Sequence, residues 1–107
     1  MAQFNVYRNL NTASKKVTPY LLDVQSNLLS DLATRVVVPM RLLTRYSGKP
    51  MKTLTPSFQI EGREVLAITQ QLAAISTKEI GASVADLTDR HFEIIAALDF
   101  VISGFCN

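Results

Sequence analysis

The sequence has little of the chemistry on which disulfide-stabilised and metal-binding proteins depend. Among its 107 residues there is one cysteine, Cys106, and one histidine, His91. A single cysteine excludes a framework of intramolecular disulfides. One cysteine and one histidine cannot by themselves supply the four ligands of a typical zinc site. We therefore expect no bound metal and no other cofactor.

A marked excess of charge of one sign is also missing. Eleven Lys and Arg residues stand against nine Asp and Glu residues, so the net charge is +2, and no block of basic residues stands out. Domains that bind nucleic acid normally carry a clustered basic face. Direct binding of nucleic acid is therefore not expected.

The chain also lacks a long uninterrupted apolar run. Residues 1–9 alternate polar and apolar side chains and contain no apolar segment of the kind found in signal peptides. The longest apolar stretch, residues 92–105, is interrupted by Glu93 and Asp99. It is shorter than the roughly 20 apolar residues that cross a bilayer. We expect a cytoplasmic protein with no membrane partner.

What the sequence does contain is enough apolar material for one small domain. Hydrophobic residues make up 48% of the chain, and its length falls in the usual size range of a single domain. No linker divides it, so residues 1–107 are treated as one domain. A core of this size gives only modest stability, which makes self-association useful.

Several segments predict β-strands in the first half of the chain. Residues 3–7 alternate in the manner of a half-buried strand, and residues 20–25 form a second candidate. The polar residues between them, 8–18, predict a long loop or a flexible connection. Residues 35–39 contain three consecutive valines, which favours a strand covered on both faces. Pro39 is expected at its end, because proline cannot donate to a strand ladder.

The middle of the chain predicts a β-hairpin followed by a short strand. Residues 57–60 and 65–68 are the two candidate strands, and residues 61–64 between them include a glycine. Such an arrangement is typical of a hairpin. Residues 72–75 predict one more short strand.

The last predicted element is a C-terminal helix that begins at Thr88 and ends at Gly104. Thr88 is a suitable N-cap, and glycine is common just past the end of a helix. Asp99 is a lone carboxylate in this segment and is expected on its exposed side, because burying it unpaired would be costly. The predicted apolar stripe consists of Ile94, Leu98, Val101 and Phe105, widened by Ile95 and Ile102. Strands followed by one helix predict an α+β fold, mainly β.

No set of residues in the sequence indicates catalysis. His91 falls in the first turn of the predicted helix, where the positive end of the helix dipole disfavours its protonated form. Cys106 lies beyond the other end of the helix, where nothing lowers the pKa of a thiol. Glu61 and Glu64 flank the hairpin loop and are interpreted as a solvated turn. Phe105, an aromatic residue close to the terminus, either packs onto the core or anchors a partner.

Short segments along almost the whole chain match one known family in order and in spacing. They are Gln3-Phe4-x-Val6-Tyr7, Asp23-Val24-Gln25-Ser26, Arg35-Val-Val-Val-Pro39, Arg41-Leu42-Leu43, Pro56, Ile60, Val84-Ala85-Asp86-Leu87, Arg90 and Gly104. On these residues the chain resembles the CcdB family, the toxins of the ccd toxin–antitoxin systems that maintain plasmids and poison bacterial DNA gyrase. Only the loop at residues 8–18 is a few residues longer here.

The resemblance implies a fold and a mechanism. The fold is a twisted antiparallel sheet in an SH3-like barrel with a C-terminal helix, shared with MazF-type toxins. Two copies form a homodimer with their C-terminal helices near the two-fold axis. The dimer binds the A subunit of gyrase when DNA is cleaved and traps that complex, so the toxin is not an enzyme. A CcdA-like antitoxin with an acidic, disordered tail removes it from gyrase.

The resemblance also implies two sets of contact residues. Gyrase contacts fall on Leu28, Leu29, Asp99, Ile102, Ser103, Gly104 and Phe105. Antitoxin contacts fall on Arg8, Lys15, Lys16, Ser103 and Phe105, where the basic loop would steer an acidic peptide. Ser103-Gly104-Phe105 stands where the best-known family members end in Trp-Gly-Ile, and we expect Phe105 to replace part of the missing aromatic contact.

Two alternatives remain at this stage. One is a MazF-type ribonuclease on the same fold, for which Arg35, Arg63 and His91 are the only candidate residues. The other is a non-toxic homologue that still binds an antitoxin, having lost gyrase poisoning through Ser103 and Asp99.

Overall fold

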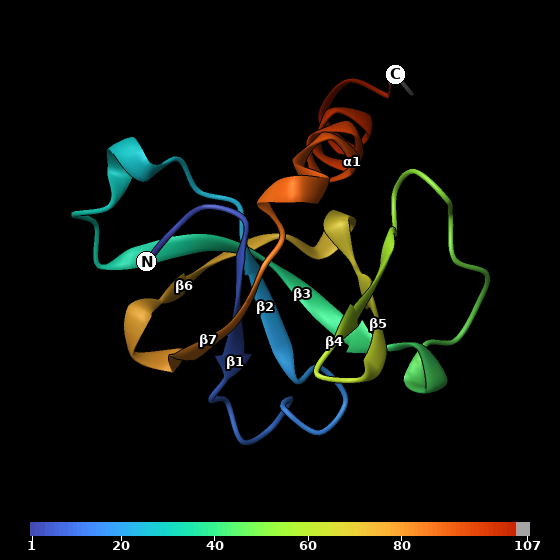
Figure 1. Ribbon diagram of the computed structural model, residues 1–107, viewed down its shortest axis with the longest axis horizontal. Coiled ribbons are helices and arrows are strands. Elements are labelled where there is room, and N and C mark those ends of the chain that lie inside the picture. The colour runs from blue at the N-terminus through green and yellow to red at the C-terminus, as the bar shows by residue number, and fades with distance from the viewer. Residues whose placement is uncertain (105–107) are drawn as a thin grey trace.

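A computed structural model of the protein describes residues 1–104, in which antiparallel strands form one curled sheet and an α-helix ends the chain (Figure 1). The elements are β1 (Asn5–Asn9), β2 (Tyr20–Asp23), β3 (Thr34–Leu42), β4 (Ser57–Ile60), β5 (Arg63–Ala67), β6 (Ala73–Ser76), β7 (Ile80–Asp86) and α1 (His91–Ser103). The order in the sheet is β4-β5-β3-β2-β1-β7, and β6 also pairs with β3. The predicted α+β, mainly β fold is therefore confirmed.

Strand β3 continues past Pro39, so the prediction that the strand ends there is wrong. One side of β3 pairs with β2 from Val37 to Met40, and the other side pairs first with β6 and then with β5. Pro39 lies between these two partners, after Val37 pairs with β6 and before Met40 pairs with β5. Its carbonyl accepts a hydrogen bond from Ile68 on this side. The missing N–H therefore falls where the strand changes partner, and proline costs little there.

The sequence prediction missed strand β7, which pairs with β1 at the edge of the sheet. The register between them shifts twice, so β7 carries extra residues opposite β1. Gly81 lies at one of these shifts. A Cβ atom added there would lie 2.9 Å from Leu10 Cδ2 and 3.1 Å from Arg8 Cβ. Glycine thus allows the two backbones to approach, and it also weakened the strand pattern in the sequence.

The core lies on both faces of the central strands. On the face covered by α1, the buried residues are Val6, Tyr20, Leu22, Val24, Val38, Met40, Phe58, Ile60, Val65, Ala67 and Ile94. Tyr7, Leu21, Val37 and Ile80 form a second cluster. Val37 and Val38 therefore point to opposite clusters, which confirms that this strand is covered on both faces.

The hairpin and the helix were predicted largely correctly, but their ends differ. Strands β4 and β5 are joined by two residues, Glu61 and Gly62, since Ile60 already pairs with Arg63. Thr88 is not an N-cap: it begins a short 3₁₀ turn, and both its N–H and its hydroxyl donate to Asp86 Oδ1. Gly104 ends the helix in the left-handed conformation, as predicted, with φ of 76°.

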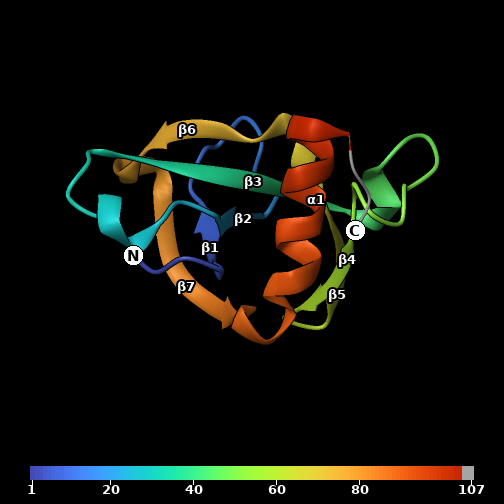
Figure 2. The same ribbon diagram turned by 90° about the horizontal axis from the view of Figure 1, so that it is seen from above.

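Helix α1 packs on the sheet through one side only (Figure 2). Ile94 and Ala97 are buried and Leu98 is half-buried, whereas Val101 lies at the exposed margin of the predicted stripe. None of the helices within residues 1–104 combines the length and the apolarity that crossing a membrane requires.

Candidate functional site

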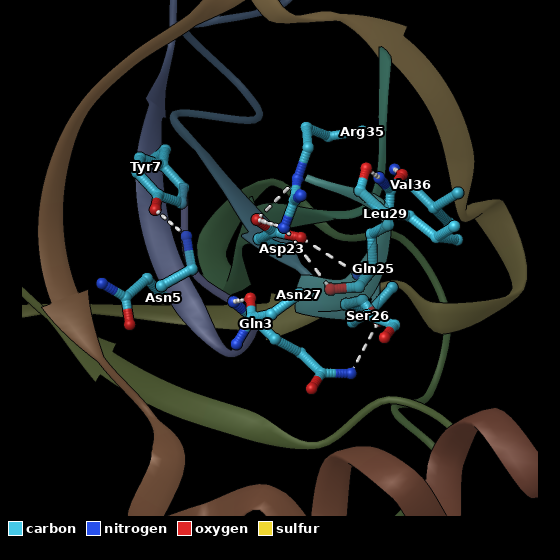
Figure 3. Close-up of polar contacts among 12 residues, drawn as sticks. Gln3, Asn5, Tyr7, Asp23, Gln25, Ser26, Asn27, Leu29, Arg35 and Val36 are labelled. Atoms are coloured by element: carbon cyan, nitrogen blue, oxygen red, sulfur yellow. Dashed lines mark hydrogen bonds and ion pairs between the residues drawn. The ribbon is translucent and has the colours of Figure 1, made fainter. Parts of the chain in front are cut away.

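A buried ion pair positions the loop that carries Leu28 and Leu29 (Figure 3). The guanidinium of Arg35 donates to Asp23 Oδ2 from Nε at 3.0 Å and from Nη2 at 2.5 Å, and both side chains are 1% exposed. Gln25 extends the network: it accepts from the N–H of Val36 and donates to the carbonyl of Leu29. The loop between β2 and β3 is therefore anchored by the ion pair between the two strands that it joins and by the side chain of Gln25 within the loop.

Three leucine side chains of this loop face solvent. Leu28 is 94% exposed, and Leu29 and Leu32 are about half exposed. Ser26 begins the turn by accepting from the N–H of Leu28, which aims the leucine outward. An exposed leucine on an anchored turn is typical of a contact surface rather than of a core.

A second apolar surface runs along the outer side of α1. Phe92, Ile95 and Ile102 face solvent here, with Asp99 between them, and we call these four residues the helix stripe. Phe92 is 77% exposed and Ile102 is 82% exposed. Asp99 is half-buried, so the expectation of an exposed carboxylate holds only in part.

The end of the helix stripe is shaped by the next two residues. Ser103 donates from Oγ to the carbonyl of Asp99 at 2.8 Å, and the N–H of Gly104 donates to the carbonyl of Phe100. Both residues are exposed. The gyrase contacts implied at Asp99, Ile102, Ser103 and Gly104 therefore form one continuous surface. Phe105 lies outside the described residues.

Leu28 and Leu29 do not join this surface within one molecule. Figures 1 and 2 both show the loop between β2 and β3 at the opposite side of the view from the C-terminal end of α1. The implied gyrase contacts thus form two separate patches on a single chain.

A groove lined by basic side chains lies at another end of the molecule. Its volume is about 400 Å³, and it is lined by Arg8, Asn9, Leu10, Lys15, Lys16, Pro19 and Arg63. We call it the basic groove. The structure therefore brings together the three basic residues implied for antitoxin binding and adds Arg63, which the sequence did not assign to this site. Ser103 lies elsewhere, since the loop between β1 and β2 and the helix are at opposite ends of Figure 1.

The loop that lines the basic groove is ordered by hydrogen bonds. Asn9 is buried and donates from Nδ2 to Ser14 Oγ and to the carbonyl of Thr18. The N–H groups of Ser14 and Lys15 both donate to the carbonyl of Asn11. The prediction of a loop is confirmed for residues 10–18, but this network holds the loop in a defined conformation.

Glu61 lies beside the basic groove, although the sequence indicated only a solvated turn. Its Oε2 contacts Arg8 Nη2 at 2.6 Å, and its Oε1 accepts from the hydroxyl of Tyr20 at 2.7 Å. The Tyr20 hydrogen bond, and after it the charge of Arg8, hold the pKa of Glu61 below its usual value. Burial raises the pKa of Tyr20, and its bond to the carboxylate adds to this. The ion pair between Arg8 and Glu61 joins residues 53 positions apart, so no local sequence pattern could have revealed it.

The residues considered for RNA cleavage do not form a site. Arg35 is buried in its ion pair, where it cannot contact a phosphate. Arg63 lines the basic groove, with its guanidinium 6.0 Å from the Tyr20 ring centre. His91 lies at the start of α1 with Nδ1 2.7 Å from the carbonyl of Thr88. Within residues 1–104, no group of three or more His, Cys, Asp and Glu side chains is placed to hold a metal ion.

The chain is similar to known proteins in sequence and in fold. The family model described as "CcdB protein" matches residues 3–104. Among solved structures, an endoribonuclease in complex with its cognate antitoxin from a mycobacterial species is similar, with a TM-score of 0.68 and 16% sequence identity. The match covers 95% of this chain and 94% of that one. At this identity the likeness shows a shared fold alone.

Proposed function

This chain belongs to the CcdB family of toxins, and we propose that it poisons DNA gyrase as the toxin of a type II toxin–antitoxin module. A dimer binds the gyrase A subunit while DNA is cleaved and prevents resealing. The toxin forms and breaks no bond in this mechanism. It acts by presenting a rigid surface that is complementary in shape to its target.

The helix stripe is the observation that carries this proposal. Ile94 and Ala97 fix the inner side of α1 on the core, while Phe92 and Ile102 remain almost fully in water. Apolar side chains gathered on an anchored element are typical of protein interfaces. Asp99 adds a carboxylate, which favours a basic side chain on the partner through a charge-assisted hydrogen bond.

A homodimer accounts for the two separate patches of implied gyrase contacts. One chain carries its exposed leucines and its helix end on different sides. Two copies related by a two-fold axis present each patch twice, so that a leucine loop of one copy and a helix end of the other can face the same partner.

The basic groove supports an acidic antitoxin segment as the second partner. Arg8, Lys15, Lys16 and Arg63 concentrate positive charge on a chain whose net charge is only +2. A disordered acidic tail suits such a surface because it can extend over a long distance. The molecule measures 31 × 30 × 22 Å, so about nine extended residues span it from the groove to the end of α1.

The proposal is tested by incubating the protein with gyrase, ATP and supercoiled plasmid and trapping cleaved complexes with detergent. We expect linear plasmid from the natural sequence and at least about tenfold less potency from Ile102→Ser, because interface anchors contribute about 2 kcal/mol. Leu10→Ser is the matched control, since Leu10 is half exposed but lies in the loop between β1 and β2, at the opposite end of Figure 1 from α1. Equal potency of both variants would refute the role of the stripe.

An RNA substrate incubated in parallel separates the alternatives. Cut RNA would indicate the ribonuclease activity, whereas neither linear plasmid nor cut RNA would indicate a homologue that only binds antitoxin. Either outcome would overturn gyrase poisoning.

The contribution of Phe105 is tested with a chain that ends at Gly104. We expect this shortened chain to lose gyrase inhibition in part, because an aromatic anchor is removed from the end of the surface. Undiminished potency would show that Phe105 replaces no aromatic contact.

A further inference from the structure

Glu61 occupies a backbone position that does not suit a glutamate. The turn between β4 and β5 consists of Glu61 and Gly62, with φ of 52° and 77°. Two-residue turns with both φ values positive strongly prefer asparagine, aspartate or glycine at the first position. The turn itself therefore does not explain a glutamate there. Strained residues are often found where a side chain has a function.

The carboxylate of Glu61 is held by one fixed and one open partner. Tyr20 is 1% exposed, so its hydroxyl has a fixed position beneath the turn. Arg8, in contrast, has a side chain that is 51% exposed and lines the basic groove. One carboxylate oxygen is thus anchored to the core, and the other contacts a cation that remains accessible to solvent.

The basic groove resembles a site for carboxylates, and the carboxylate of Glu61 lies beside it. Its lining, within residues 1–104, contains four cations and no acidic side chain. Glu61 contacts it through Arg8, at the distance expected of a charge-assisted pair, and its charge also interacts more weakly with Arg63. When an acidic peptide enters the groove, Arg8 is already paired with Glu61.

We propose that Glu61 is a built-in competitor that occupies Arg8 in the free toxin and yields it to an acidic side chain of the antitoxin. The inference rests on the proposed antitoxin binding and names what regulates that site. When Arg8 changes partner, Glu61 keeps its hydrogen bond to Tyr20, so only half of its contacts are lost. The exchange replaces one arginine–carboxylate contact by another. Glu61 therefore lowers the affinity for the antitoxin and eases its release.

The test measures binding of a fluorescein-labelled peptide of ten glutamates by fluorescence anisotropy, at about 0.15 M salt, where surface charges are screened beyond about 8 Å. We expect Glu61→Gln to tighten binding about three- to tenfold, because one competing charge is removed. Glu64→Gln is the matched control. It removes the same charge from the same hairpin, but Glu64 contacts Gln59 and lies outside the groove lining.

Further variants separate charge from turn conformation. Glu61→Asn removes the carboxylate and introduces the residue that this turn prefers, so it should tighten binding as Glu61→Gln does. Arg8→Gln should weaken binding, and adding Glu61→Gln to it should then have much less effect than in the natural sequence, because the competition acts mainly through Arg8. Thermal unfolding of each variant confirms that it is folded.

The outcomes distinguish this inference from the function on which it rests. If the natural sequence does not bind the peptide, both the antitoxin groove and the competitor are refuted. If binding depends on Arg8 but is unchanged or weakened by Glu61→Gln, the groove stands and the competitor is refuted. Equal tightening by Glu64→Gln would also refute it, since net charge alone would then be responsible.

Discussion

Two arginine–carboxylate pairs in this molecule use the same chemistry in opposite surroundings. Arg35 and Asp23 are each 1% exposed, whereas Arg8 and Glu61 are 51% and 35% exposed. The contact distances are almost equal, at 2.5 and 2.6 Å. Geometry alone therefore does not distinguish them, and burial determines what each pair does.

The difference separates a structural pair from an exchangeable one. In the buried pair neither charged group is accessible to water, so removing one partner leaves the charge of the other uncompensated. In the open pair water screens both charges, and the contact contributes little to stability. The first pair fixes the loop that carries Leu28, and the second leaves Arg8 available to a partner.

Breaking the buried pair should have the largest effect. Asp23→Ala leaves the Arg35 guanidinium buried without a counterion, and we expect a loss of about 3–5 kcal/mol in the free energy of unfolding. Urea denaturation measures it. Asp31→Ala is the control, since Asp31 lies exposed in the loop between the same two strands. A loss as small as that of the control would contradict the structural role.

Replacing both members of the buried pair should restore much of that loss. Arg35 Nη1 has no hydrogen-bond partner among the described residues, so the pair is not fully satisfied. We expect Asp23→Leu with Arg35→Met to be about 2 kcal/mol more stable than Asp23→Leu alone. Additive losses in a double-mutant cycle would show that the two residues act independently.

Displacing the backbone beside the open pair should have an intermediate effect. In Gly81→Val the new side chain meets Leu10 and Arg8, so we expect a loss of about 1–2 kcal/mol. Because Arg8 moves, binding of the glutamate peptide should weaken as well. Ala82→Val provides the control at the neighbouring exposed position of β7. Unchanged peptide affinity in Gly81→Val would show that Arg8 tolerates the shift.

The smallest effect is expected from pH acting on the open pair. The pKa of Glu61 is lower in the folded protein, so the contact stabilises the fold above about pH 4.3, the ordinary value for glutamate. That contribution is lost as the pH falls through the lowered folded-state pKa. The natural sequence should therefore be slightly more stable than Glu61→Gln at pH 7, and the difference should close at low pH. A urea midpoint difference that persists in acid would contradict this.

Local patterns predicted the elements that depend on local interactions. The hairpin at β4 and β5, the helix and the role of Gly104 could all be read from spacing and glycine placement. The position of Pro39 inside β3 could not be predicted in this way, because a proline is tolerated there only where the strand changes its neighbouring strand. Strand β7 was missed because Gly81 interrupts its pattern, although the same glycine permits its pairing with β1.

The same limit applies to the candidate site. Arg8, Lys15 and Lys16 are close in sequence and were found together in the structure. Arg63 and Glu61 reach the same place through the hairpin, and no spacing in the sequence indicates that contact. The exposure of Ile102 was also open, because an apolar helix residue can face either the core or a partner.

The pairing of β1 with β7 also has a consequence for synthesis of the chain. Asn5 pairs with Asp86, so the edge of the sheet closes only after most of the chain exists. Contacts between such distant residues slow folding, because a long loop must be ordered first. The helix that carries the proposed toxic surface follows β7. The proposed toxic surface is therefore positioned on the sheet only late in folding, after its two most distant strands have paired.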